Sequence, residues 1–250
     1  MVTRMIALIL AGGKGERLRP YTEDRPKVMV SILGRPLVEF QVRWLKENGV
    51  ERIVFLSGYL NEVIAAHFGD GSKFGVHIDY SVEEIPLGRG GALKQGFSQF
   101  GRDEQLVLAT NGDVLTAEPL SPFVNAHRRS GAAASVLLAP LISPYGVADL
   151  DGNLRIEGFR EKPVLPYWIN AGVYVLDRSC LDMLPDRGDH EDTMFPQLAR
   201  KGSLLGYNAT SYWRAVDTVK DLTEANGESP THFPSWLLPQ QEMMHPDQLW

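Results

Sequence analysis

The sequence lacks the features that mark secreted, membrane-embedded and disulfide-rich proteins. It contains one cysteine in 250 residues, Cys180, and a single cysteine cannot form an internal disulfide. The apolar stretch near the N-terminus, residues 5–11, is far shorter than the roughly 20 residues of a membrane-spanning helix. Two glycines and then charged residues follow that stretch, which is not the pattern of a signal-peptide cleavage site. These absences predict a globular protein of the reducing cytoplasm.

The sequence also lacks a large excess of charge of one sign. The 25 Lys and Arg residues against 31 Asp and Glu residues give a net charge of −6, and no run of five like charges occurs. We therefore expect neither a nucleic acid nor a membrane as a partner, because both require a basic patch. The six histidines have no metal-ligand spacing, which argues against a zinc site; they are His67, His77, His127, His190, His232 and His245.

Short apolar runs alternate with segments of helical periodicity over the first 140 residues. The pattern predicts strands at residues 5–11, 53–56, 76–82, 105–109 and 132–139, and helices at 36–48, 62–68, 92–100 and within 114–130. Such alternation is typical of βαβ units, so the predicted fold class is α/β, a Rossmann-like three-layer sandwich with a mostly parallel central sheet. Ligands bind such sheets at the carboxyl ends of the strands, which directs attention to the loops after residues 11, 58, 82 and 109.

The pattern changes after residue 140, where we expect an additional β-rich region that supplies a second wall of the site. Strands at 146–150 and 154–159 flank an Asp-Gly-Asn turn and predict a β-hairpin, followed by strands at 169–176 and 204–216 and a helix at 193–201. We expect one domain over residues 1–226, with halves of about 1–140 and 141–226. Residues 227–250 contain four prolines and no periodicity, which indicates a C-terminal tail that wraps the surface or is disordered.

Glycine is the residue present in excess, at 24 of 250 residues, and three glycines follow the first predicted strand. The segment LAGGKGERLRP, residues 10–20, places Gly12, Gly13 and Gly15 before two arginines and leads to Pro26-Lys27. Glycines let backbone N–H groups approach phosphate oxygens, and arginines add donors for the same oxygens. A Walker A motif is absent, and a dinucleotide-binding fingerprint would need a third glycine where Leu18 stands. The segment predicts a phosphate-binding loop of another kind.

With L-A-G-G-x-G-x-R-L-x-P followed by P-K, the chain resembles the sugar-1-phosphate nucleotidylyltransferases. The resemblance covers about residues 5–226, because shorter motifs recur in the family's order. They are Pro86-Leu87-Gly88 with Gly90-Gly91, Asn111-Gly112-Asp113, Tyr145-Gly146-Val147, Glu161-Lys162-Pro163, Asn170-Ala171-Gly172 and Val216-Asp217-Thr218. Some relatives append a left-handed β-helix, whereas this sequence has no hexapeptide repeats, so we expect the transferase domain with a short tail.

The resemblance implies an enzyme that transfers a nucleoside monophosphate from a nucleoside triphosphate (NTP) to a sugar 1-phosphate. An oxygen of the sugar phosphate attacks the α-phosphorus in line, and pyrophosphate leaves. The reactants together carry about six negative charges, so the site must supply positive ones, with Mg²⁺ as the implied cofactor. No general base is needed, since a phosphate with a second pKa of about 6 is already largely dianionic. The two substrates are the implied partners, and an assembly of identical chains stays open.

The resemblance also assigns roles to individual residues. Arg17 and Lys27 would hold the triphosphate and stabilise the leaving pyrophosphate, and Asp113 and Asp217 would bind Mg²⁺, which prefers carboxylates together with substrate phosphates. An alternative for Asp217 is the N-cap of the following helix. The sugar-phosphate site would comprise Gly146, Glu161, Lys162, Asn170 and Gly172. The nucleotide site would comprise Leu10, Ala11, Gly12, Gly13, Gly15, Glu83, Pro86, Leu87, Gly88 and Gly91.

Two residues depart from the family pattern. Arg89 stands where a small hydroxyl residue is usual, and it would either contact a phosphate or face water. Glu16 stands where Ser or Thr is commonest, and an acid beside the triphosphate is unfavourable unless it points away or pairs with a basic neighbour. Two aromatic residues leave a similar choice, since Tyr145 and Trp168 would either line the sugar site or belong to the core.

Within the family, residues 68–72, residues 80–84 and the Pro-Leu-Gly motif are most similar to guanylyltransferases that act on mannose-type hexose or heptose 1-phosphates. GTP is therefore the favoured NTP. Thymidylyl- or uridylyltransfer to a glucose-type 1-phosphate is the alternative, and a catalytically idle regulatory protein that binds NDP-sugar is an alternative from another class. A cytidylyltransferase for a non-sugar phosphate shares the opening motif, but the Glu-Lys-Pro and Asn-Ala-Gly elements favour a sugar.

Overall fold

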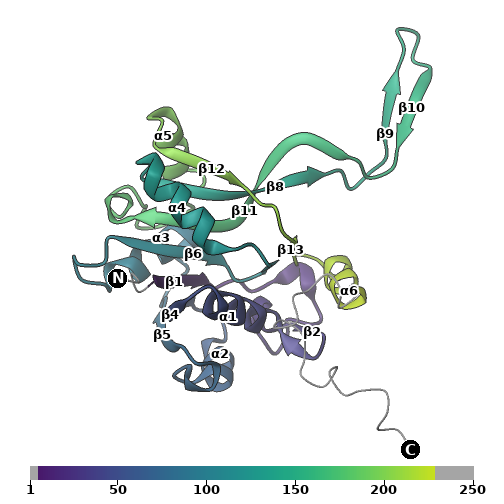
Figure 1. The fold of residues 1–250 in the computed structure, drawn as a ribbon. Helices are drawn as coiled ribbons and strands as arrows, with labels where there is room; N and C mark the ends of the chain where they lie inside the picture. Colours follow the sequence, from purple (N-terminus) through teal and green to yellow (C-terminus); the bar gives the residue numbers. More distant parts are fainter. Residues whose placement is uncertain (1–4, 229–250) are drawn as a thin grey trace, which may run out of the picture.

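The computed structural model describes residues 5–228, and its central element is a seven-stranded sheet (Figure 1). The strand order is β12-β8-β11-β6-β1-β4-β5. Only β11 is reversed in direction, since it pairs antiparallel with β6 and β8 while the other neighbours pair in parallel. The strands are β1 (Met5–Leu10), β4 (Val50–Ser57), β5 (His77–Val82), β6 (Leu106–Asn111), β8 (Ala134–Ile142), β11 (Val164–Asp177) and β12 (Leu204–Asn208).

Helices cover both faces of this sheet. One face packs against α1 (Leu37–Glu47), α2 (Asn61–Phe68) and α4 (Leu120–Ser130), and the other packs against α3 (Gly88–Ser98) and α5 (Met194–Arg200). Strand β1 shows why: Ala7 and Ile9 belong to one hydrophobic cluster, whereas Ile6 and Leu8 belong to the other. A strand buried on both faces is a continuous apolar run rather than an alternating one. The predicted three-layer α/β fold is confirmed.

A third, smaller cluster joins the last helix, α6 (Val219–Gly227), to the loops that follow β1. The remaining elements are short: η1 (Glu16–Leu18), η2 (Lys27–Met29), β2 (Ser31–Ile32), β3 (Arg35–Pro36), η3 (Ser72–Phe74), β7 (Val114–Thr116), η4 (Arg178–Cys180) and β13 (Trp213–Ala215). Cys180 is buried and donates to the carbonyl of Ala133. Among residues 5–228, none of the helices combines the length and hydrophobicity needed to cross a bilayer.

The single strand predicted over residues 204–216 is wrong, because the chain divides there into two strands of different sheets. Strand β12 extends the central sheet beside β8, whereas β13 pairs antiparallel with β7. The buried carboxylate of Glu118 accepts hydrogen bonds from the backbone N–H groups of Thr210 and Ser211, at 2.9 and 2.8 Å. These N–H groups therefore bond to a side chain instead of to a neighbouring strand, and the chain leaves the central sheet at this point.

Helix α3 begins four residues earlier than predicted, so Gly88, Gly90 and Gly91 lie in its first turn rather than in a loop. The N–H groups of Gly90 and Gly91 donate to the carbonyl of Gly188, and a Cβ atom at Gly90 would lie 2.7 Å from the ring of Pro185. The glycines let this helix approach the loop at residues 185–190. The assignment of Gly91 to the nucleotide site stays a prediction.

The predicted hairpin is confirmed, with strands β9 (Val147–Leu150) and β10 (Ile156–Arg160) around a turn in which Asp151 accepts from the N–H groups of Asn153 and Arg155. The hairpin projects away from the body of the molecule on the outer ends of β8 and β11 (Figure 1). We call residues 142–168 the hairpin arm. The predicted division near residue 140 falls inside β8, and both parts contribute strands to the same sheet. Apart from residues 227 and 228, the predicted tail lies outside the described residues.

Candidate active site

A cavity of about 650 Å³ opens at the carboxyl ends of β1, β4, β5 and β6, with β11 and β13 forming its opposite wall. Open α/β sheets place ligand sites at this edge, and the volume lies within the roughly 300–1,000 Å³ range of small-molecule sites. The loops predicted after residues 11, 82 and 109 all contribute to it. Predicted site residues that line the cavity are Leu10, Gly12, Gly13, Arg17, Lys27, Glu83, Pro86, Gly88, Asp113, Asn170, Gly172 and Asp217.

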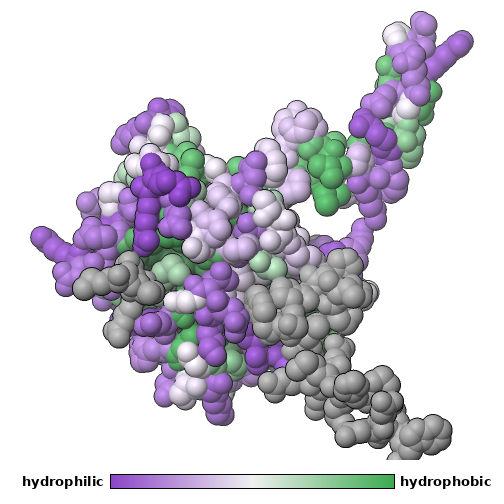
Figure 2. Space-filling view, in the orientation of Figure 1, coloured by the Kyte–Doolittle hydropathy of each residue, from purple (hydrophilic) through white to green (hydrophobic). Residues whose placement is uncertain are grey.

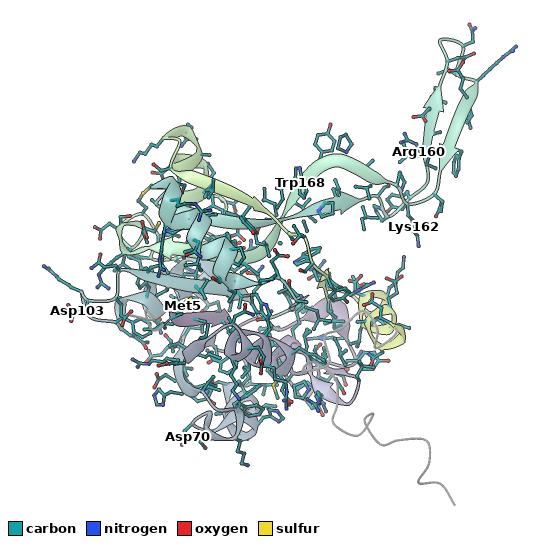
Figure 3. All side chains as sticks on the ribbon, in the orientation of Figure 1. Met5, Asp70, Asp103, Arg160, Lys162 and Trp168 are labelled. Atoms are coloured by element: carbon teal, nitrogen blue, oxygen red, sulfur yellow. The ribbon has the colours of Figure 1, made fainter. Side chains whose placement is uncertain are left out.

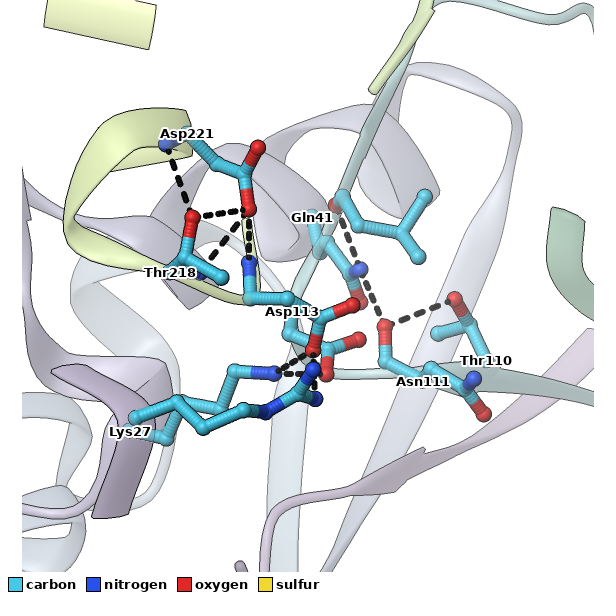
Figure 4. Close-up of polar contacts among 10 residues, drawn as sticks. Lys27, Gln41, Thr110, Asn111, Asp113, Thr218 and Asp221 are labelled. Atoms are coloured by element: carbon cyan, nitrogen blue, oxygen red, sulfur yellow. Dashed lines mark hydrogen bonds and ion pairs between the residues drawn. The ribbon is translucent and has the colours of Figure 1, made fainter. Parts of the chain in front are cut away.

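The floor of the cavity is a network of two cations and two carboxylates (Figure 4). The ammonium of Lys27 lies 2.5 Å from Asp113 Oδ2 and 2.6 Å from Asp217 Oδ1, and Arg17 donates to the same oxygen of Asp217 at 2.8 Å. Partial burial would raise the pKa of Asp217, but the hydrogen bond and charge of Lys27 and the charge of Arg17 outweigh it and lower that pKa. Four side chains from three segments that are far apart in the sequence therefore converge at one point.

The loop after β1 brings the two cations together. Gly15 adopts a left-handed conformation with φ of 67°, and a Cβ atom there would lie 2.7 Å from Cβ of Lys27. Thr22 closes the loop by donating to the carbonyl of Gly15 at 2.9 Å. Glycine is required at this turn because it allows both the positive φ and the close approach, and the turn folds Lys27 back beside Arg17.

A buried glutamine on α1 holds the turn that carries Asp113. The side-chain amide of Gln41, which is 2% exposed, donates to the carbonyls of Asn111 and Val114 at 2.5 and 2.6 Å. These two carbonyls flank Asp113 in the sequence, and Gly112 N–H donates to the carbonyl of Leu10. Gln41 thus clamps both ends of the turn between β6 and β7, which fixes the direction of the Asp113 carboxylate.

The N-cap alternative for Asp217 is wrong, because Thr218 is the N-cap of α6. Thr218 and Asp221 form a reciprocal capping box at the start of this helix. The carboxylate of Asp217 is left free to face Lys27 and Arg17, and the N–H of Val216 bonds to the carbonyl of Asp113 at 2.9 Å. This backbone contact brings the two aspartates to the same side of the cavity.

Glu83 forms the wall after β5. One carboxylate oxygen accepts from the N–H of Leu87 at 2.9 Å. The other oxygen lies 2.8 Å from the position that a Cβ atom would take at Gly12, and equally far from that position at Gly58. The side chain therefore lies flat against two glycines and lines the cavity. This leaves an acceptor-only group at the mouth of a space bounded by glycine backbone.

The Arg89 side chain is 47% exposed and pairs with acidic neighbours, and a contact with phosphate stays a prediction. Its guanidinium pairs with Asp189 and Glu191, both at 2.7 Å, and its N–H donates to Asp189. Burial raises the pKa of Glu191 despite the charge of Arg89. The arginine ties the first turn of α3 to the loop at residues 186–191, and both Arg89 and Asp189 line the cavity.

The opposite wall is formed by β11 and β13. Asn170 accepts from the N–H of Gly172 at 2.8 Å and donates to the hydroxyl of Tyr174 at 3.0 Å, and Trp213 donates to the carbonyl of Ala171 at 2.8 Å. Asn111 lies beside Gly172 on the neighbouring strand β6, and its side-chain oxygen is buried and without a hydrogen-bond partner among the described residues.

Several predicted site residues lie outside the cavity lining. Ala11, Gly15, Leu87 and Gly91 belong to the segments that carry lining residues, whereas Gly146, Glu161 and Lys162 belong to the hairpin arm, which Figure 3 shows extending away from the body. In the arm, the Phe159 ring and Glu161 fill the space where a side chain of Gly146 would lie. The sugar-phosphate roles of these three residues stay predictions.

Tyr145 and Trp168 are neither core residues nor cavity residues, since they are 75% and 51% exposed on the arm. Glu16 is exposed and does not line the cavity.

Four residues escaped the sequence prediction of the site: Gln41, Asn111, Asp189 and Trp213. Asn111 belongs to the same Asn-Gly-Asp motif as Asp113, so its position two residues before a predicted metal ligand is a signal that could have identified it. Gln41 and Asp189 carry no local signal, because their place depends on helix α1 and on a loop that reaches the cavity from more than 70 residues away in the sequence.

The donor set fits Mg²⁺. Asp113 and Asp217 share one cation, Lys27, so their oxygens already converge, and Mg²⁺ is bound through one or two carboxylates together with substrate phosphates. Within residues 5–228, no group of three or more His, Cys, Asp or Glu side chains is placed to hold a metal ion. A metal ion here would therefore take its remaining ligands from substrate and water.

Comparison with known proteins is consistent with this geometry. A model of the nucleotidyl transferase family matches residues 6–231. A mannose-1-phosphate guanylyltransferase of Mycobacterium tuberculosis is 34% identical over 237 residues, which cover 91% of this chain and 66% of that protein. A UTP–glucose-1-phosphate uridylyltransferase of Synechocystis is 35% identical over 243 residues, covering 88% of this chain and 62% of that protein. The chain thus spans just under two thirds of the length of these relatives. The structure of HddC from Yersinia pseudotuberculosis shares the fold, with a TM-score of 0.71, 24% identity and coverage of 89% of this chain and 98% of that one.

Proposed function

The chain belongs to the nucleotidyl transferase family, and from that premise we propose that it transfers a nucleoside monophosphate from an NTP to a sugar 1-phosphate. The observation that carries this proposal is the convergence of Arg17, Lys27, Asp113 and Asp217 on the floor of one cavity. Cations and paired carboxylates are the groups that phosphoryl chemistry needs, and no nucleophilic side chain is required.

The charge of the cavity supports a requirement for Mg²⁺. Its lining holds three cationic side chains, Arg17, Lys27 and Arg89, and four anionic ones, Glu83, Asp113, Asp189 and Asp217, so the balance is 3 − 4 = −1. A triphosphate would not enter a negative cavity without an added cation. Mg²⁺ held by Asp113 and Asp217 would supply that charge and stabilise the negative charge that develops on the phosphates.

Arg17 and Lys27 would bind the triphosphate by exchanging partners. Both cations pair with Asp217. Phosphate oxygens would take the place of that carboxylate, and the two cations would then stabilise pyrophosphate as it leaves. The attacking oxygen belongs to the sugar phosphate, one P–O bond forms at the α-phosphorus, and the bond to pyrophosphate breaks.

Glu83 supports guanine as the base. A carboxylate accepts hydrogen bonds but donates none. Guanine offers two adjacent donors on its Watson–Crick edge, whereas uracil and thymine offer one donor between two acceptors, which a carboxylate would repel. Glu83 lies against Gly12 and Gly58 at the cavity wall, where a flat base would pack on glycine backbone. GTP is therefore the proposed NTP.

The sugar phosphate would occupy the side formed by Asn111, Asn170 and Gly172. Asn111 and Asn170 carry side-chain amides, and all three residues line the cavity. A mannose-type hexose or heptose 1-phosphate is the proposed acceptor, which agrees with the guanylyltransferase similar over 91% of this chain. The uridylyltransferase relative keeps a glucose-type acceptor with UTP or TTP as the second candidate.

The test is a matrix of nucleotides and sugar 1-phosphates with Mg²⁺ in which pyrophosphate release is measured. We expect the fastest release with GTP and a mannose-type 1-phosphate, and no release after Mg²⁺ is removed. Absence of pyrophosphate with every combination, together with tight binding of an NDP-sugar in calorimetry, would instead identify a regulatory protein. An Asp113→Asn variant, compared with Asp103→Asn in an exposed loop, separates true turnover from contamination.

A further inference from the structure

The first turn of α3 is capped by a loop that lies 100 residues later in the sequence. The N–H of Arg89 donates to Asp189 Oδ1 at 2.9 Å, and the N–H groups of the next two residues donate to the carbonyl of Gly188. The first N–H groups of a helix have no partner within the helix, and a side chain at the N-cap usually supplies one. The N-cap residue here is Leu87, which has no polar side chain. Gly188 and Asp189 therefore supply the cap from another segment.

The same loop also holds Leu87 at the wall that carries Glu83. The carbonyl of Leu87 accepts from the N–H of Gly188 at 2.7 Å, while its own N–H donates to a carboxylate oxygen of Glu83 at 2.9 Å. A Cβ atom at Gly88 would lie 2.8 Å from the carbonyl oxygen of Gly188, so the two backbones are in direct contact. Leu87 thus links the loop to the Glu83 carboxylate through one hydrogen bond on each side.

The loop is itself fixed on two sides. Arg89 contacts both oxygens of Asp189, because its N–H donates to Oδ1 and its guanidinium donates to Oδ2 at 2.7 Å. The next residue, His190, is fully buried and packs edge-on against Tyr174 and Phe195, with its ring centroid 5.0 and 4.8 Å from theirs. Burial lowers the pKa of His190 to about 3, so the ring is neutral at pH 7. The Asp189 carboxylate therefore lies between Arg89 and a residue anchored in the core.

Selection of a base by hydrogen bonds requires a reading group of fixed direction, because a hydrogen bond weakens steeply as its angle closes. We propose that Asp189 is a positioning residue for nucleotide choice, which holds the Glu83 carboxylate in its base-reading orientation by capping the turn that contains Leu87. This inference rests on the proposed function, in which Glu83 reads guanine. Its new element is that the selectivity of Glu83 depends on a carboxylate of a distant segment.

Direct contact of Asp189 with the sugar fits less well. Asp189 lines the cavity, but each of its oxygens accepts a hydrogen bond from Arg89, and its side chain is 32% exposed. The hydrogen bond from Arg89 lowers the pKa of Asp189, so the group is a carboxylate at pH 7 and has no donor to offer. A sugar hydroxyl would have to compete with a charged donor for the same oxygen.

A second ion pair joins the same helix and the same loop, and it provides the control. Lys94 Nζ lies 2.7 Å from Asp186 Oδ1, and the Asp186 side chain is 93% exposed. Neither residue lines the cavity, and neither side chain bonds to Leu87 or Glu83. Loss of this pair removes a link between the two segments without removing the cap of α3.

Two substitutions of Asp189 in the full chain separate its contacts. Asp189→Ala removes the acceptor for Arg89 N–H, so the ratio of kcat/KM for GTP to that for UTP should fall roughly fivefold, the usual effect of losing an N-cap side chain. Asp189→Asn keeps an acceptor oxygen, and Asn caps helices as well as Asp does, so its ratio should stay within about twofold of the wild type. Arg89 retains Glu191 as an ion-pair partner in both variants. Asp186→Ala should leave the ratio unchanged.

Hydrogen exchange of the Leu87 and Arg89 amides provides a readout that does not need turnover. Both amides should exchange faster in Asp189→Ala than in the wild type, and at the wild-type rate in Asp189→Asn and Asp186→Ala. Circular dichroism checks that each variant is folded. Unchanged exchange at Leu87 in Asp189→Ala would overturn the proposal, because the wall would then be held without this carboxylate.

The kinetic outcomes distinguish this inference from the function on which it rests. A wild type that favours GTP, together with an Asp189→Ala variant that favours it equally, contradicts the positioning role of Asp189 alone. The same conclusion follows if the Ala and Asn variants lose selectivity equally, or if the only change is a higher KM for the sugar 1-phosphate. A wild type without preference for GTP contradicts base reading by Glu83 and this inference together.

Discussion

The side chains of the cavity floor and those of the hairpin arm differ in burial and in how many contacts they make within the chain. On the floor, charged groups from distant segments are half-buried and satisfied within the chain, as Lys27 is between Asp113 and Asp217. On the arm, large apolar groups such as Phe159 are 64% exposed and have little to pack against, and Figure 2 shows hydrophobic residues along the arm. Both regions lie at the ends of the same sheet. The charged groups of the floor thus have their partners within the chain, whereas the described residues bury less than half of each of nine large apolar residues of the arm.

The strongest test of the floor is the loss of a carboxylate. Asp113→Asn should lower kcat by about 10³-fold or more, because the ion that would neutralise the phosphates loses a ligand and several kcal/mol of transition-state stabilisation. Steady-state pyrophosphate release measures this, and circular dichroism checks the fold. Asp103→Asn, in an exposed loop, is the control. Unchanged turnover in the Asp113 variant would remove it from the metal site.

The same substitution made in the body and in the arm tests the contrast in packing. Phe97→Ala removes a fully buried ring and should lower the free energy of unfolding by about 3–5 kcal/mol. Phe159→Ala should change it by no more than about 0.5 kcal/mol, as measured by urea unfolding. Equal losses at both positions would mean that the arm is packed within its own chain.

Gln41 tests whether the floor depends on a residue that touches no substrate. Gln41→Met keeps the size of the side chain but leaves the carbonyls of Asn111 and Val114 short of a donor, which should cost about 1–3 kcal/mol of stability. We expect kcat to fall about 10–100-fold, with a higher Mg²⁺ concentration needed for half-maximal rate. Gln197→Met on an exposed helix face is the control. A stability loss with an unchanged Mg²⁺ dependence would limit Gln41 to a structural role.

Nucleotide choice is expected to depend on one atom of Glu83. Glu83→Gln replaces a carboxylate oxygen with a donor, so kcat/KM for GTP should fall about tenfold or more while that for UTP or TTP rises. Competition assays with paired nucleotides measure the ratio. The neighbouring Glu84 is exposed, and Glu84→Gln should leave the ratio as it is. A uniform loss with all nucleotides would contradict base reading by Glu83.

The smallest expected effect is the pH dependence that Asp217 contributes. Its folded-state pKa lies below the ordinary 3.8 despite partial burial, because of Lys27 and Arg17. Its contribution is therefore present above pH 3.8 and is lost as the pH falls through the lower folded value. The Tm of Asp217→Asn should lie a few degrees below the wild type at pH 7, and the gap should close towards pH 3. A gap that widens on acidification would contradict this assignment.

Much of the fold and of the floor could be predicted because the signals are local. The apolar run at β1 and the helical spacing of α1 indicate their elements without any partner, and the loop from Gly12 to Arg19 carries its phosphate chemistry in a few adjacent residues. Asp113 and Asp217 were predicted from short motifs at the ends of apolar runs. The break between β12 and β13 could not be predicted, because it depends on the buried carboxylate of Glu118 from another segment.

The sequence by itself determined the alternation of strands and helices, the family resemblance and the chemical type of the cavity, since each depends on residues close together in the chain. Only the tertiary structure decided that Arg89 pairs with Asp189 and Glu191, that Gln41 clamps the Asp113 turn, and that Lys162 lies on an arm outside the cavity. The physical reason is the same in all three cases: the position of a side chain depends on which segments the sheet and its helices bring to it, and that information is absent from local sequence.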